Sequence, residues 1–141
     1  MSRHLTTLTM STIALLGLAA AFSGGNVSAQ QKKPASILVH EVTSVDCTLE
    51  KSNPPNALVK AKGKVPTLGH TNPQLVLVLY VMPPVDGIQD LLFYVDSPTG
   101  DMVPPAIQEV ETPILRIEHL PSWMKGVRVR AATNKIEKSC S

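Results

Sequence analysis

Short apolar runs alternate with clusters of proline, glycine and asparagine from Ser36 to the end of the chain. Runs of this length bounded by turn residues are typical of β-strands. No long window repeats its apolar positions with the helical period without a proline or glycine inside it, so we predict no long helix. The predicted strands are residues 37–43, 57–65, 75–81, 91–95, 106–110, 114–119 and 127–132, with shorter candidates at 46–50 and 134–138.

Seven or eight short strands with turns between them predict an all-β fold. The expected architecture is an antiparallel two-sheet sandwich, immunoglobulin-like in its layers, formed by the single domain of residues 36–141.

Two of the predicted strands, 75–81 and 91–95, are apolar on both faces, whereas a sandwich strand should be polar on its outer face. As hairpin partners they would place their outer faces side by side, and something should cover the resulting patch. The cover is either the protein's own proline-rich loops or a second subunit or other partner. Trp123 either caps the open end of the core or anchors a partner. The candidate interaction surface is Leu77, Leu79, Tyr80, Leu92, Tyr94 and Trp123.

The N-terminus has the pattern of a secretory signal peptide. The apolar stretch 13–22 is too short to span a membrane, and Val27-Ser28-Ala29 offers the small residues that a signal peptidase requires. We therefore predict a signal peptide at 1–29, a flexible lead-in at 30–35, and a periplasmic or secreted protein that does not span the membrane. Without Arg3, 12 Lys and Arg face 11 Asp and Glu, which excludes a strongly cationic nucleic-acid binder.

The two cysteines, Cys47 and Cys140, fit an oxidising compartment and predict one disulfide. The alternative is a catalytic or metal-binding thiol. Neither cysteine has a CxxC partner or an adjacent histidine, so the disulfide is favoured.

Metal binding has weak candidates in His119, Met124 and His70, because imidazole and thioether suit copper. The histidines are isolated and lack the spacing of a metal motif. We expect His119 and His40 to be half-buried on strand faces, and His70 to be free in a loop. No cofactor is predicted.

The charged residues support two further hypotheses, one for the acids and one for the basic residues. Asp86, Asp90, Asp96 and Asp101 bracket the predicted strand 91–95. Asp86 and Asp90 could lie near each other and flank a small cleft, although Asp86-Gly87 is also a good turn and no calcium-loop or catalytic motif is present. Basic residues alternate along two strands, at 60–64 and 128–130, and should form solvated outer faces. The lysine strand could also guard a sheet edge. If both strands belonged to one sheet, they would form a basic stripe.

One set of short motifs lies mostly in the middle of the chain. It consists of Gly63-x-Val65-Pro-Thr67, Thr71-Asn-Pro73, Leu75-Val76, Tyr80-Val81, Pro83-Pro84, Asp86-Gly-Ile88-x-Asp90, Gly126-Val-Arg-Val129 and Asn134. In these motifs the chain resembles a group of small exported bacterial proteins of unknown function, and the likeness covers roughly half of the mature chain. No activity or site residue follows from this resemblance.

The sequence therefore predicts an exported, non-catalytic protein that binds a partner or plays a structural role. The candidate partners are another protein and a second copy of the chain, which would form a homodimer through the apolar sheet face. The alternatives are a periplasmic copper or zinc carrier, and a small enzyme that acts on a surface or cell-wall polymer.

Overall fold

Two long strands with alternating buried and exposed side chains form the first hairpin of the structure, a computed structural model that describes residues 33–141. β2 (Glu41–Glu50) and β3 (Asn56–Val65) pair antiparallel, and the proline-rich turn at 51–55 ends the ladder between them. Lys33–Ser141 forms one compact unit. The predicted signal peptide and the start of the lead-in, up to residue 32, lie outside the described residues.

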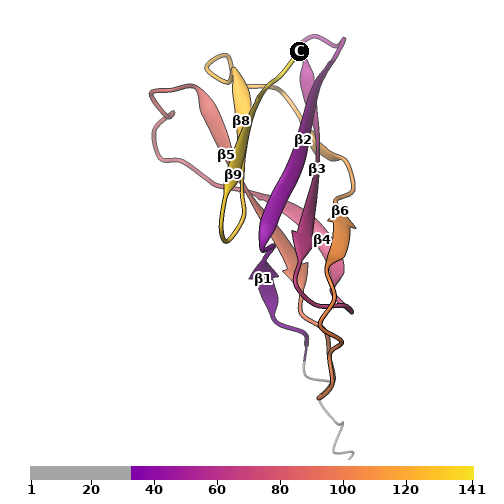
Figure 1. Cartoon of the computed structure of the whole chain (residues 1–141). Coiled ribbons are helices and arrows are strands. Elements are labelled where there is room, and N and C mark those ends of the chain that lie inside the picture. The colour runs from indigo at the N-terminus through magenta and orange to yellow at the C-terminus, as the bar shows by residue number, and fades with distance from the viewer. Residues whose placement is uncertain (1–32) are drawn as a thin grey trace, which may run out of the picture. The chain divides into compact units, whose positions relative to one another are not determined.

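β3 is the central strand of a four-stranded sheet (Figure 1). β2 lies on one side of it, and β6 (Gln108–Glu111) and β7 (Leu115–Ile117) follow one another along the other side. The outer face of this sheet carries the predicted lysines. Lys60 and Lys62 both pair with Glu111 of β6, so this is a solvated face of mixed charge.

β5 (Ile88–Asp96) is the central strand of the second, five-stranded sheet. β4 (Thr71–Leu77) runs along one side of β5 as an edge strand. β1 (Ser36–Leu38) and β8 (Gly126–Arg130) share the other side, and β9 (Lys135–Ser139) pairs with β8.

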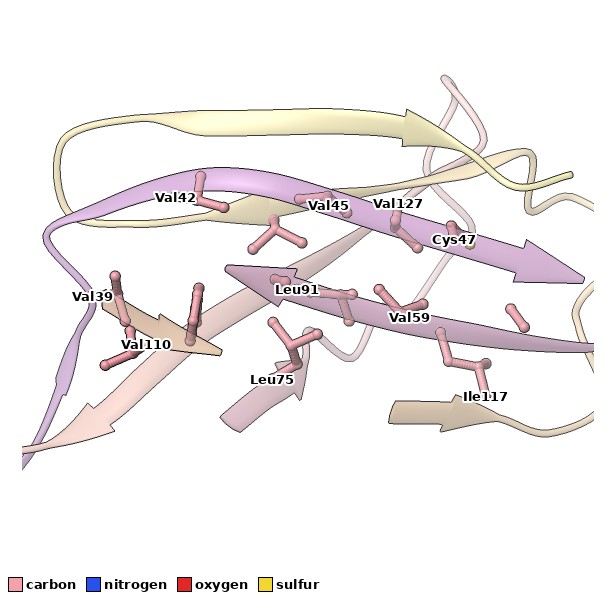
Figure 2. Close-up of a cluster of buried hydrophobic side chains, with 14 of the residues drawn as sticks. Val39, Val42, Val45, Cys47, Val59, Leu75, Leu91, Val110, Ile117 and Val127 are labelled. Atoms are coloured by element: carbon pink, nitrogen blue, oxygen red, sulfur yellow. The ribbon is translucent and has the colours of Figure 1, made fainter. Parts of the chain in front are cut away.

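The core fills the space between the two sheets, where the buried side chains of alternate strand positions meet. Figure 2 shows these side chains pointing toward one another from both sheets. Phe93 is the largest fully buried side chain. The labelled members are Val39, Val42, Val45, Cys47, Val59, Leu75, Leu91, Val110, Ile117 and Val127.

The structure confirms the predicted all-β two-sheet sandwich and the predicted hairpin, since Leu75 pairs with Phe93 and Leu77 with Leu91. One pairing differs from the expectation of an antiparallel fold: β5 and β8 are parallel. Between β5 and β8 the chain passes through β6 and β7 of the other sheet. Such a crossover permits parallel pairing.

The predicted strand 37–43 is in fact divided. Val39 still donates its N–H to the Phe93 carbonyl at 2.8 Å, but a bend at His40 moves the chain from β1 in one sheet to β2 in the other. The predicted strand 75–81 begins earlier, at Thr71, and ends at Leu77.

For the basic strands, the suggested edge role of the lysines was wrong, and the condition for a basic stripe is not met. The lysine strand β3 has neighbours on both sides and therefore guards no edge. Because β3 and β8 belong to different sheets, their basic residues form no single stripe.

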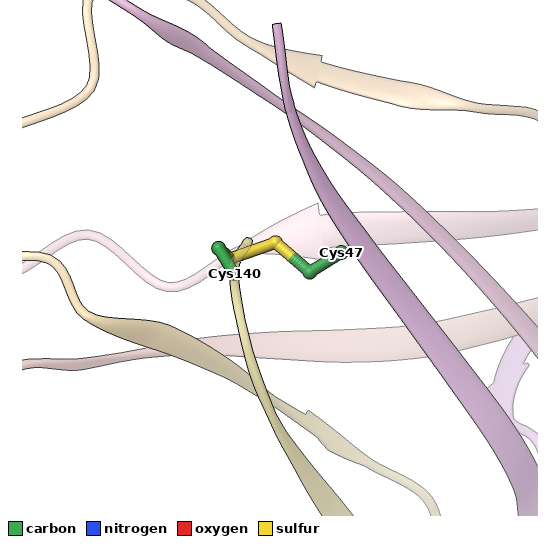
Figure 3. Close-up of a disulfide and its surroundings, with 2 residues drawn as sticks. All are labelled: Cys47 and Cys140. Carbon is green, nitrogen blue, oxygen red and sulfur yellow. A yellow bond between two sulfur atoms is a disulfide. The ribbon is translucent and has the colours of Figure 1, made fainter.

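One side of the sandwich, between β2 and β9, is closed by side-chain and backbone bonds. Asn134 bonds both the N–H and the carbonyl of Val42, each at 2.8 Å. The carbonyl of Ser141 accepts the N–H of Leu49 at 3.2 Å. The predicted disulfide between Cys47 and Cys140 joins the same two segments (Figure 3).

We expect the disulfide to supply a large share of the stability, because it closes a loop with a sequence separation of 93. Replacing both cysteines by alanine should lower the free energy of unfolding by about 2–5 kcal/mol, measured by urea denaturation. Reduction of the natural protein should produce a similar loss. An unchanged midpoint in the double variant would show that the bond is dispensable for stability.

Candidate functional site

The side of the sandwich opposite the disulfide is open, and a groove of about 260 Å³ lies there. One wall comes from β4 and the chain that follows it, and the other comes from β7 and the loop that leads to β8. The lining is mainly apolar. It consists of Leu77, Val78, Leu79, Tyr80, Pro83, Gln89, Ile117, Glu118, Pro121, Trp123 and Met124.

Beside the groove the chain between β4 and β5 projects away from the sandwich, at the left of Figure 1. We call residues 79–85 the rim loop. Its apolar side chains are held in water: Leu79 is 90% exposed, Val81 103%, Met82 77% and Val85 107%. Isolated exposed apolar residues are ordinary, but four in one short loop are a feature that needs an explanation.

Side-chain bonds fix the start of the rim loop where β4 leaves β5. Val78 still donates its N–H to the carbonyl of Asp90 at 3.1 Å. The Gln89 side-chain amide then donates to the Val78 carbonyl at 2.8 Å. The Tyr80 hydroxyl accepts the N–H of Asp90 at 3.1 Å. Side chains thus replace the strand's backbone partners at the point where the ladder ends.

The carboxylate of Asp90 is the centre of this network. It accepts hydrogen bonds from Tyr80 Oη at 2.5 Å, from Arg130 Nε at 2.9 Å and from Arg128 Nη1 at 3.2 Å. Only 12% of the Asp90 side chain is exposed. Burial alone would raise its pKa, but the bonds from Tyr80 and the two arginines outweigh burial and hold the pKa below its usual value. Burial and the bond to this carboxylate raise the pKa of Tyr80.

Arg128 extends the network to the far end of the rim loop. Its guanidinium contacts Asp86 at 2.8 Å, Glu137 at 2.7 Å and Asp90 at 3.2 Å. The hydrogen bonds to Asp86 and Glu137 raise the pKa of the guanidinium above its ordinary value. The bond from Arg128, and that from the N–H of Ile88, lower the pKa of Asp86.

Gly87 closes the rim loop with a turn that only glycine fits. Its φ is +70°, and a Cβ there would lie 2.7 Å from the carbonyl oxygen of Trp123. Its N–H donates to Pro84, and its carbonyl accepts the N–H of Lys125 at 2.8 Å. This close approach ties the rim loop to the opposite wall of the groove.

Tyr80 and Trp123 meet across the groove with their ring centroids 6.4 Å apart, edge to face. Trp123 is partly buried and packs against the core. It therefore caps one end of the core, as one of its two predicted roles required, and also forms part of the groove wall.

The structure divides the predicted interaction surface between two places. Leu77, Leu79, Tyr80 and Trp123 line the groove. Leu92 and Tyr94 are half-buried on the outer face of the same sheet, where Leu92 lies opposite Val76 on β4.

The predicted surface omitted Val81, which was assigned to the strand 75–81, and Met82 and Val85, because the prolines at 83 and 84 identified their segment as a turn. The apolar content of that turn was the available signal, since a turn usually carries polar residues.

The weak metal candidates are not brought together. His70 is buried, not free, and its Nδ1 lies 3.0 Å from the Thr67 carbonyl. His40 and His119 are exposed, not half-buried, because both lie where a strand bends or ends. Met124 is buried in the core. Across residues 33–141 no group of three or more His, Cys, Asp or Glu side chains could hold a metal ion.

The two carboxylates considered for a catalytic cleft do lie close together, but both are paired with the same guanidinium, that of Arg128. Asp86 also accepts the N–H of Ile88 at 3.0 Å, which is the turn chemistry that its sequence predicted.

No family model, curated protein or solved structure matches this chain. In the described part of the chain, no helix is long and apolar enough to cross a membrane.

The network around Asp90 predicts a specific effect of pH. Replacing Tyr80 by phenylalanine removes a hydrogen bond to the carboxylate, so the Asp90 pKa should rise toward its ordinary value of about 3.9. NMR titration of the Asp90 carboxyl carbon measures this shift directly.

The same substitution should lower the free energy of unfolding by about 1–2 kcal/mol at neutral pH. A lowered carboxyl pKa stabilises the folded protein above about pH 4, and this stabilisation is lost as the pH falls through the folded-state pKa. The difference between the natural protein and the variant should therefore shrink in acid. Tyr94→Phe is the matched control. A Tyr80→Phe effect that does not depend on pH would contradict the coupling to Asp90.

Proposed function

We propose that this protein is an exported, non-catalytic binding protein, and that the rim loop and the adjoining groove form its binding surface. The partner is an apolar surface on another polypeptide. The observation that carries this proposal is that four apolar side chains stand in water on a loop that is fixed at both ends.

The cost of this exposure supports a binding role. Apolar surface in water is unfavourable by about 25 cal/mol per Å², so a segment without a partner gains stability if it packs against the protein. Here the network of Asp90 and Arg128 holds the loop away from the sandwich. Binding would recover the lost burial, and a fixed loop loses little conformational freedom when it binds.

The local charges favour a protein partner over an anionic lipid surface. Residues 71–85 carry no charged side chain. The nearby arginines, Arg128 and Arg130, are already paired with acids, and Glu118 in the groove wall offsets the charge of Lys125 beside Gly87. An anionic membrane would find little electrostatic attraction at this site.

Photo-crosslinking tests the proposed surface. A photoreactive residue in place of Val85 should form one discrete adduct in the exported fraction of the producing cells, because the side chain is fully exposed on the rim loop. The same residue in place of Lys62, which is exposed on the outer face of the other sheet, is the control and should form none.

A second substitution identifies the apolar contact. Val81→Ser in the Val85-labelled chain should weaken the adduct, since it removes a neighbouring apolar side chain without touching the network. Equal labelling from both positions, or no adduct from Val85, would contradict the proposal. An adduct with the mass of two copies of this chain would show that the partner is a second copy and not another protein.

Export is the second part of the proposal, and it rests on the pattern of residues 1–29 together with the disulfide. The mature protein should begin at Gln30 and contain oxidised Cys47 and Cys140. N-terminal sequencing and intact-mass analysis of the exported fraction measure both. A chain that keeps its first 29 residues and stays with the cytoplasmic fraction would contradict export.

A further inference from the structure

Strand β4 is the exposed edge of the five-stranded sheet. Within residues 33–141 it pairs only with β5. An exposed strand edge offers unpaired N–H and carbonyl groups to another chain, and proteins usually protect such edges with charges, prolines or covering segments.

The other long edge has such protection. Asn134 and the C-terminal residues cover β2, which also carries Glu41, Asp46 and Glu50. Charged residues occupy β6, β7 and β9, and β1 has only 3 residues.

By contrast, β4 and the chain that continues it are unprotected beyond Pro73. The segment Leu75–Leu79 contains only leucine and valine. Among the strand edges of residues 33–141, its free edge is therefore the one where a further strand could pair without meeting a charge.

The backbone alternation shows which groups this edge presents. Val78 donates its N–H to the carbonyl of the opposite residue, Asp90, which makes them a hydrogen-bonded pair. In an antiparallel ladder such pairs alternate with pairs that turn their backbone groups outward. The N–H and carbonyl groups of Leu75 and Leu77 therefore point away from β5. We extend the alternation by one residue past Val78, which gives the backbone groups of Leu79 the same direction.

The sequence of this segment, Leu-Val-Leu-Val-Leu, reads the same in both directions. An antiparallel pair of identical segments about a two-fold axis at Leu77 would place Leu75 opposite Leu79 of the other copy, and Val76 opposite Val78. Leucine then meets leucine on the groove face, and valine meets valine on the other face. The outward backbone groups of both copies fall at matching positions, as hydrogen-bonded pairs require.

From these observations we propose that two copies of this chain associate through their β4 edges, with Leu75–Leu79 of each copy paired antiparallel about Leu77. The contact is isologous, so it closes as a dimer and does not propagate. Pro73 limits its length, because proline has no N–H to donate. This inference does not rest on the proposed partner: Leu79 is shared by the rim loop and the paired segment, but Val81, Met82 and Val85 lie outside the pairing.

Sedimentation of the oxidised mature protein tests the proposal, and a dimer is expected at micromolar concentrations. Leu79→Pro should raise the dissociation constant by about tenfold or more, because it removes one outward N–H from each copy. Residue 79 is 90% exposed, so the substitution should spare the monomer fold. Leu79→Lys is a second variant that disturbs the pairing without a proline. Val85→Lys, on the exposed rim loop outside the pairing, is the control and should remain a dimer.

Amide hydrogen exchange identifies the edge that pairs. The N–H groups of Leu75 and Leu77 should exchange slowly in the natural protein and quickly in the Leu79 variants. A natural protein that stays monomeric would overturn the proposal. A dimer that survives both Leu79 substitutions would also overturn it, as would loss of the dimer in Val85→Lys. Fast hydrogen exchange at Leu75 and Leu77 in the natural dimer would show that another surface pairs, and would overturn it as well.

Discussion

The carboxylate of Asp90 is the group on which the open side of this protein depends. A buried charge is costly unless it is paired and hydrogen-bonded, and Asp90 meets that requirement with Tyr80, Arg128 and Arg130. Tyr80 fixes the start of the rim loop, and Arg128 fixes its end through Asp86. The polar network therefore fixes both ends of the segment that carries the exposed apolar side chains of the rim loop.

The sandwich is asymmetric, and the asymmetry separates stability from binding. The side between β2 and β9 is closed by the disulfide, by Asn134 and by the C-terminal backbone. The opposite side keeps a groove, an unprotected strand edge and the rim loop. Because the closed side already links the two sheets, the open side can keep apolar surface accessible.

The sequence allowed the layers of the fold to be predicted, because strand alternation and turn residues are local signals. The hairpin of β4 and β5 followed from the same reasoning. The disulfide was predicted separately, from two cysteines in a chain with an export signal. The bend at His40 and the parallel pairing of β5 with β8 could not be predicted, because they depend on how the chain moves between sheets.

The candidate site was only partly predictable for the same reason. Leu77, Leu79, Tyr80 and Trp123 were identified from their apolar character, and they do line one groove. The salt-bridge network was not foreseen, because Asp90 and Arg128 are far apart in sequence and meet only through the pairing of β5 with β8.

Backbone ¹⁵N relaxation of residues 79–85 tests the central claim most directly, namely that the apolar rim loop is held rigid in water. We expect order parameters close to those of the strands, about 0.85, and a clear decrease in Tyr80→Phe. Order parameters below about 0.6 in the natural protein would contradict the account, because a mobile loop would not be the preorganised binding surface described above.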